Sequence, residues 1–344
     1  MVQTQWNSPE SASQNESLSE AHNGSRLITI VLDGLRYDAA REYLGYMEHL
    51  VEQSSAACYK VISELPSLSR PLYEVLLTGT PAFENGITSN QIVRLSEEES
   101  LFHIARNAGL TTAAAAYHWV SELYNKAPFN PFQDRHQHDE RLPIMHGAFY
   151  FEDHYPDTHL FADAEHLRQS WHPHFLYVHS MNIDDAGHRY GGKSKQYEGA
   201  VRVVDSILAM AVPQWVAAGY SVIVTADHGM TESGQHGGRT REEREVPFYG
   251  IGRAFTPGAV EEPIPQLAVA PLMAALLGLP PSPRMSLHTV PGVRLPHYSE
   301  QERDQEEERQ QERGQEYEHE HEQEHGQKCG QEREGDAAFT ESRT

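Results

Sequence analysis

The sequence predicts an α/β fold in which helices sandwich a largely parallel sheet. Apolar runs of buried-strand length, separated by helix-like segments, are typical of such a sheet. Three of these runs are followed within three residues by an aspartate, which indicates a polar site at one edge of the sheet. The four runs are residues 27–32, 112–117, 174–181 and 220–226.

The segments between these runs supply the helices of the predicted sandwich. Glycines that follow three of the segments, Gly79, Gly109 and Gly278, are typical of helix C-termini. The stretch 118–170 is irregular and rich in Pro, Phe, Tyr and His, so we expect an inserted cap over the site. The predicted helices are residues 37–53, 71–78, 96–107, 195–208 and 264–277.

Both ends of the chain differ in composition from its centre. Residues 1–25 offer almost nothing to bury and are predicted to be a disordered leader. Residues 299–344 form a low-complexity tail rich in Glu, Gln and His. The catalytic domain is therefore expected over residues 26–298.

Charge and cysteine content narrow the classes of function. The formal net charge is −23, and −13 remains without the tail, which disfavours stable nucleic-acid binding and anionic membranes. The two cysteines, Cys58 and Cys329, cannot build a disulfide framework. No secretory leader or uninterrupted apolar span is evident, so we expect a cytoplasmic enzyme with a small phosphate-ester substrate and no membrane partner. The oligomeric state cannot be predicted.

Carboxylate and imidazole groups gather where the apolar runs end. Asp33 follows the first run, Asp184 and His188 follow the third, and Asp227 with His228 follow the fourth. A further histidine, His236, is flanked by glycines. One aspartate after a strand is more commonly a helix cap, and one histidine is more commonly structural, but the combination favours a metal site. Oxygen and nitrogen ligands suit zinc, with manganese as the second choice.

A candidate nucleophile, Ser69, precedes a helix-like run. The N-terminus of a helix attracts phosphate through its free N–H groups and its dipole. From local sequence alone, Ser69 can equally be the cap of that helix.

Residues 65–79 and 86–90 resemble the nucleophile region of nucleotide pyrophosphatase/phosphodiesterases in the alkaline phosphatase superfamily. The shared pattern is Pro, Ser or Thr, any residue, the nucleophile, any residue and Pro, then a helix ending in Thr-Gly, and later Gly-Ile before an Asn. The sequence departs from the family in having Asn85 where histidine is common, and Ser69 where many diesterases have threonine.

The resemblance implies an alkaline phosphatase-like fold and a role for each motif residue. Ser69 takes the nucleophile position, and Asn90 takes the position that donates to a non-bridging phosphate oxygen. Two divalent cations are implied, and their ligands fall into two groups. One cation is held by Asp184, His188 and His236, and the other by Asp33, Asp227 and His228 with the oxygen of Ser69.

The expected activity is metal-dependent hydrolysis of a phosphodiester or pyrophosphate bond in a nucleotide-type small substrate, through a phosphoseryl intermediate. Phosphomonoesterase, phosphonate (C–P) hydrolase and non-catalytic metal-binding protein remain alternatives. Arg70 would favour a monoester dianion, whereas Asn90 favours a diester. Aromatic residues of the expected cap either stack a base or form a small core of their own. They are Trp119, Phe129, Phe132, Tyr150, Phe151 and Tyr155.

Overall fold

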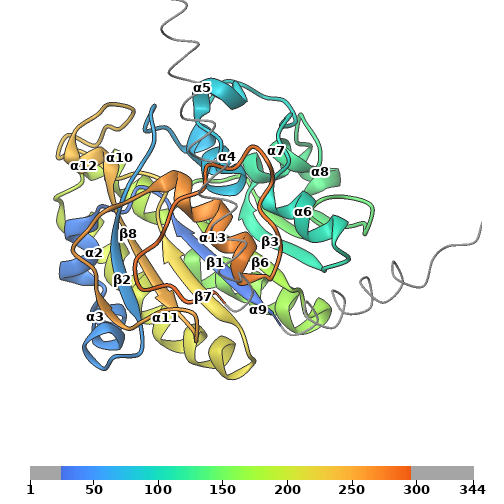
Figure 1. Cartoon of the computed structure of the whole chain (residues 1–344). Coiled ribbons are helices and arrows are strands. Elements are labelled where there is room, and N and C mark those ends of the chain that lie inside the picture. Colours follow the sequence, from blue (N-terminus) through green and yellow to red (C-terminus); the bar gives the residue numbers. More distant parts are fainter. Residues whose placement is uncertain (1–24, 296–344) are drawn as a thin grey trace, which may run out of the picture. The chain divides into compact units, whose positions relative to one another are not determined.

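A ten-stranded mixed sheet forms the centre of residues 25–295, the part of the chain that the computed structural model describes (Figure 1). The predicted tail over 299–344 lies outside these residues, and so does the predicted leader over 1–25 apart from Ser25. The strand order is β10-β2-β8-β7-β1-β6-β3-β5-β4, with β9 beside β2. The strands are β1 (Leu27–Leu32), β2 (Ala57–Ile62), β3 (Thr112–Tyr117), β4 (His136–His138), β5 (His146–Tyr150), β6 (Phe175–Ser180), β7 (Ser221–Thr225), β8 (Glu245–Ile251), β9 (Gly258–Ala259) and β10 (Ile264–Pro265).

Five neighbouring strands, β7, β1, β6, β3 and β5, run parallel, as the sequence predicted. Every residue of β1, β3, β5 and β6 is buried, because helices cover both faces of the sheet. The carboxyl ends of these five strands therefore lie along one edge. Antiparallel strands flank the parallel set, with β8 between β7 and β2, and β4 beyond β5.

The helices form two groups that pack among themselves, one containing α2, α3, α9, α10 and α11 and the other α4, α6, α7 and α13 (Figure 1). The first group contacts β3, β5, β6 and β7 through α9 and α11. The helices are α2 (Tyr37–Tyr43), α3 (Gly45–Glu52), α4 (Ser69–Thr78), α5 (Ala82–Asn85), α6 (Leu101–Asn107), α7 (His118–Tyr124), α8 (Pro131–Asp134), α9 (Asp157–Trp171), α10 (Asn182–Tyr190), α11 (Lys195–Ala217), α12 (Arg241–Arg244) and α13 (Val269–Leu276), with a 3₁₀ turn at Gln266–Ala268.

The predicted helix over 37–53 is two helices that meet at Leu44, and the one over 264–277 begins with strand β10 and a 3₁₀ turn. Helix α11 continues to Ala217, past Pro213. Among the described helices, α11 is the one whose length and composition would allow it to cross a membrane. It packs on α2, α3, α10 and β7, as expected of a helix that covers a core.

The expected cap over 118–170 is largely part of the sheet and its covering layer. Strand β5 pairs in parallel with β3, and β4 pairs with β5, so both extend the sheet. Helix α9 packs on β3, β5 and β6. Helix α7 packs against α4, which carries the candidate nucleophile. Residues 118–170 thus contribute two strands and a covering helix to the main fold, a role that the local sequence does not reveal because the strands pair with distant segments.

Candidate active site

Three aspartates meet at the carboxyl ends of neighbouring strands. Asp33 directly follows β1, Asp227 follows β7, and Asp184 lies in the first turn of α10, after β6. All three are buried, with at most 3% of each residue exposed. Because β7, β1 and β6 are adjacent and parallel, their ends place these carboxylates side by side. The polar edge that the sequence predicted is therefore present.

The first ligand group consists of Asp33, Asp227 and His228, whose candidate ligand atoms lie within 4.8 Å of one another. His228 Nε2 lies 3.3 Å from Asp33 Oδ1 and 3.4 Å from Asp227 Oδ2. All three side chains are fully buried. This is the set that the sequence resemblance implied for one cation, together with Ser69.

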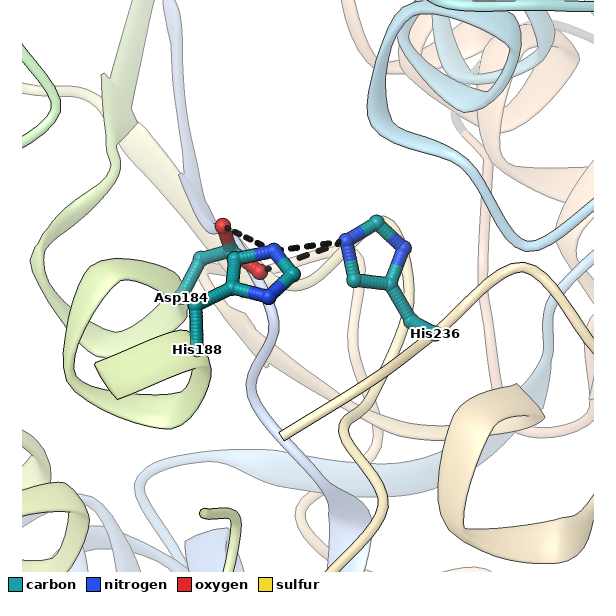
Figure 2. Close-up of side chains that lie close together, drawn as sticks. All are labelled: Asp184, His188 and His236. Atoms are coloured by element: carbon teal, nitrogen blue, oxygen red, sulfur yellow. Dashed lines mark hydrogen bonds and ion pairs between the residues drawn. The ribbon is translucent and has the colours of Figure 1, made fainter. Parts of the chain in front are cut away.

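The second group consists of Asp184, His188 and His236 (Figure 2). Asp184 and His188 are four residues apart on α10, which places both on one face of the helix. His188 Nε2 lies 3.3 Å from Asp184 Oδ2 and 3.0 Å from His236 Nε2. His236 Nε2 lies 3.7 Å from Asp184 Oδ1. Figure 2 shows Asp184 and His188 on one helix and the His236 ring facing them from a separate segment.

Backbone carbonyl groups orient the imidazole rings of all three histidines. The Nδ1 atoms of His188, His228 and His236 lie 2.9, 2.9 and 2.8 Å from the carbonyl oxygens of Gly234, Gly229 and Ser67, respectively. A carbonyl only accepts, so each Nδ1 carries a proton, and in the neutral ring each Nε2 then keeps a lone pair. Metal-binding histidines are commonly held in this way.

The buried oxygens of both groups fit cations. Within residues 25–295, Asp33 Oδ1, Asp184 Oδ1 and Asp227 Oδ2 are buried and lack a hydrogen-bond partner. Burial, together with the charge of Asp33, raises the pKa of Asp184 and of Asp227 well above the usual value. Buried carboxylates without partners are costly, and a divalent cation in each group would supply the missing positive charge. The donor set, oxygen and imidazole nitrogen, suits zinc or manganese.

Two residues that the sequence analysis did not select hold Asp33 in place. Tyr73 donates a short hydrogen bond to Asp33 Oδ2, and His179 Nε2 lies 3.2 Å from the same oxygen. Burial raises the pKa of Asp33, but His228, His179 and Tyr73 together outweigh it and lower that pKa to about 2. Asp33 is therefore charged, and its Oδ1 faces His228. A histidine inside the apolar run 174–181 was a signal that could have revealed His179.

Ser69 is the first residue of α4, as the predicted position before a helix required. Its Oγ lies 3.1 Å from His228 Nε2, so the hydroxyl borders the Asp33/Asp227/His228 group. Helix α4 ends at Gly79, whose left-handed backbone (φ 62°) closes the last turn. The structure thus brings the candidate nucleophile and this candidate ligand group together.

Asn90 lies beside the nucleophile. Its side-chain Oδ1 accepts a hydrogen bond of 3.0 Å from the backbone N–H of Arg70. This contact fixes the orientation of the amide and leaves its NH₂ group as the donor. Asn90 is half-buried, in keeping with a position at the rim of the site.

The side chain of Arg70 is buried in the protein interior. It is 1% exposed, its Nη2 lies 2.7 Å from Glu122 Oε2, and its guanidinium packs 4.6 Å from the ring centroid of Trp119. Glu122 also accepts a hydrogen bond from the backbone N–H of Phe129. The charge of Arg70 is thus balanced by Glu122, while its Nε and Nη1 atoms are buried without a hydrogen-bond partner within residues 25–295.

The comparison with protein families identifies the chain. Residues 27–325 match the family described as type I phosphodiesterase / nucleotide pyrophosphatase. The chain belongs to this family. The resemblance seen in the sequence is thereby confirmed, and membership supports a phosphodiesterase-type centre that uses divalent metals.

The curated relatives are named as transferases, whereas the family is named for phosphodiesterase and pyrophosphatase activity. Human GPI ethanolamine phosphate transferase 2, catalytic subunit, is 24% identical over 74% of this chain and 26% of its own length. GPI ethanolamine phosphate transferase 2 of Candida albicans is 24% identical over 81% of this chain and 33% of its own length. The chain spans about a quarter of the length of the first such relatives.

Solved structures confirm the predicted fold class. Murine ectonucleotide pyrophosphatase / phosphodiesterase 5 superposes with a TM-score of 0.61 at 14% identity, over 75% of this chain and 96% of that one. A 2-O GAG sulfatase superposes with a TM-score of 0.57 at 12% identity, over 80% of this chain and 76% of that one. At such identities the likeness establishes the fold alone.

The prediction of a cytoplasmic protein is wrong. The curated relatives are GPI ethanolamine phosphate transferases, which are named for a membrane glycolipid. The prediction rested on the presence of only two cysteines and on the lack of a recognisable secretory leader or apolar span. Neither observation determines the compartment in which a protein works, which is why the prediction failed.

Gly34→Ala is expected to lower the metal content of the protein. Gly34 has a φ of +72°, and a Cβ atom there would lie 2.9 Å from Asp184 Oδ1. The matched control is Gly109→Ala, at a φ of +78° with no atom within 4 Å. Both variants should lose about 1 kcal/mol of unfolding free energy or more through backbone strain. Elemental analysis should show metal loss in Gly34→Ala alone, and equal metal in both variants would contradict the assignment of Asp184 as a ligand.

Tyr73→Phe should weaken metal binding, because it removes the hydroxyl that holds Asp33 Oδ2. Loss of such an outer contact typically lowers metal affinity about 10- to 100-fold. Competition with a chelator measures the change. Tyr59→Phe is the control, since the Tyr59 hydroxyl donates to the carbonyl of Pro291 and is not part of either ligand group. Unchanged affinity in Tyr73→Phe would remove Tyr73 from the site.

Proposed function

We propose that the chain cleaves a phosphodiester, with Ser69 as the nucleophile. The observation that carries the proposal is the position of Ser69 Oγ, at the N-terminus of α4 and 3.1 Å from His228 Nε2. A hydroxyl beside a candidate cation site and a helix N-terminus is well arranged to attack a bound phosphate. Membership of the phosphodiesterase family supports the same chemistry.

Two divalent cations, zinc or manganese, belong to the proposal. Asp33, Asp227 and His228 would hold one, and Asp184, His188 and His236 the other. When bound, such a pair stabilises the negative charge that develops on the attacking and leaving oxygens during in-line displacement at phosphorus.

Backbone and side-chain groups of the protein bind and orient the substrate. The dipole of α4 and the backbone N–H of Ser69 attract the phosphate, and the NH₂ group of Asn90 donates to a non-bridging oxygen. Ser69 Oγ forms a bond to phosphorus while the bond from phosphorus to one alkoxy group breaks. The proton of Ser69 ends on that alkoxy group, which departs as an alcohol, and the phosphate with its remaining ester group stays bonded to Ser69. A second acceptor then releases that ester and restores the hydroxyl.

A diester is the preferred substrate class because of the groups around the phosphate. Arg70, the cation next to the nucleophile, is paired with Glu122 in the interior. Asn90 is a neutral donor, which suits the single charge of a diester better than the double charge of a monoester. Phosphomonoesterase and phosphonate hydrolase are thereby the less favoured activities.

The acceptor distinguishes two candidate functions. Water as the acceptor gives hydrolysis, the activity in the name of the family. An alcohol gives transfer, and the curated relatives are named for the transfer of ethanolamine phosphate. Both reactions begin with the attack of Ser69, so the centre described above serves either. Hydrolysis is the primary proposal, and transfer is the second candidate.

The first test compares bis-p-nitrophenyl phosphate with p-nitrophenyl phosphate, using the zinc- and manganese-loaded protein. We expect faster turnover of the diester. Ser69→Ala should lose activity by on the order of a thousandfold or more while keeping its metals, and Ser170→Ala, at an exposed position of α9, serves as the control. Preference for the monoester, or activity that survives in Ser69→Ala, would overturn the proposal. Adding a primary alcohol and following the products by ³¹P NMR separates transfer, which gives a new diester, from hydrolysis.

A further inference from the structure

Glu243 is a buried residue that contacts segments of both candidate ligand groups. It lies in α12 and is 5% exposed. Its backbone carbonyl accepts a hydrogen bond of 2.8 Å from the N–H of Gly229, which directly follows His228. Its side-chain Oε1 accepts one of 2.7 Å from the N–H of Gly238, two residues after His236. A single residue therefore holds a segment of each ligand group.

Helix capping explains only part of these contacts. Glu243 is the third residue of α12, and its Oε2 accepts from the N–H and the hydroxyl of Thr240, at 2.9 and 2.7 Å, which completes a capping box. The hydrogen bond from Gly238 to Oε1 lies outside that motif. Burial raises the pKa of Glu243, but the hydrogen bonds from Thr240 and Gly238 outweigh it and lower that pKa, so the carboxylate is charged and accepts at both oxygens.

Ser67 holds the other polar group of Gly238 and lies close to the nucleophile in the chain. Ser67 is fully buried, and its Oγ donates to the carbonyl of Gly238 at 2.9 Å. Its own carbonyl accepts from His236 Nδ1 at 2.8 Å. Ser69 follows two residues later. The loop that carries His236 is therefore joined to the segment that carries the candidate nucleophile.

The position of His236 matters because its ring packs on a ring of the first ligand group. The rings of His228 and His236 are nearly parallel, at 17°, with centroids 3.8 Å apart. His228 Nε2 lies 3.1 Å from Ser69 Oγ, and His236 Nε2 lies 3.0 Å from His188 Nε2 (Figure 2). Two cations act together on the attacking and leaving oxygens only at a defined separation, so the His236 loop has to be held in place.

We propose that Glu243 and Ser67 are positioning residues that fix His236 in the second ligand group relative to the nucleophile. Glu243 acts through the N–H of Gly238, and Ser67 acts through the carbonyl of the same residue. Glu243 belongs to neither ligand group, since its carboxylate oxygens accept from Gly238 and Thr240. The inference rests on the two cations of the proposed function.

Glu243→Gln tests the carboxylate, because the backbone carbonyl that holds Gly229 remains. We expect the affinity for one cation to fall about 10- to 100-fold and the affinity for the other to stay within about twofold. Chelator competition on the zinc-loaded protein measures both affinities, and His236→Ala should weaken the same cation. The matched control is Glu242→Gln, a carboxylate 35% exposed that faces Arg36 and Lys193, which should keep both affinities.

Ser67→Ala separates positioning from charge, because it removes an uncharged hydroxyl. We expect this variant to weaken the same cation about fivefold, as the loss of one hydrogen bond predicts. In the double variant Ser67→Ala/Glu243→Gln, the loss should be smaller than the product of the two single losses, since both side chains hold Gly238. Should Glu243→Gln fail to fold, Ser67→Ala decides the proposal.

Wild-type affinity for both cations in Glu243→Gln and Ser67→Ala would overturn the positioning role. An equal loss of both cations would do the same, because it would indicate a general loosening of the fold. In both cases the proposed function stands, since the wild-type protein binds two cations. If the wild-type protein binds fewer than two, the positioning role and the two-cation part of the proposed function fail together.

Discussion

The site depends on three buried carboxylates that share one edge of the sheet. Asp33, Asp184 and Asp227 lie at the ends of β1, β6 and β7, and each has a buried oxygen without a hydrogen-bond partner within the described residues. Like charges so close together and so far from water require a positive partner. The backbone leaves room for these carboxylates, since Gly34 packs directly against Asp184 with no space for a side chain. Histidines oriented by carbonyl groups complete two ligand groups around the same carboxylates.

Local sequence predicted the parallel centre of the sheet well. The runs 27–32 and 112–117 coincide with β1 and β3, because strands buried on both faces are apolar at nearly every position. Strand β2 was missed because Lys60 lies in its centre, and β8 because Pro247 lies in the middle of its sequence. Those two residues pair with each other in the antiparallel part of the sheet, a relation that no local pattern reveals.

The site residues that the sequence predicted depend on a neighbouring element of structure, whereas those that it missed depend on residues distant in the sequence. Asp33, Asp227 and Ser69 each lie next to a strand or a helix that the sequence predicts. Tyr73 donates a hydrogen bond to Asp33 from another element of the fold. Arg70 is paired with Glu122, which is 52 residues away in the sequence. Such roles depend on tertiary neighbours, so they follow from the fold and not from spacing.

The stereochemical course at phosphorus tests the central claim most directly. With a diester made chiral at phosphorus by sulfur substitution, attack by Ser69 followed by release to water or an alcohol comprises two in-line displacements. Each displacement inverts the configuration, so the account predicts overall retention. Overall inversion would show that the acceptor attacks the substrate directly, and would remove Ser69 from the role of nucleophile.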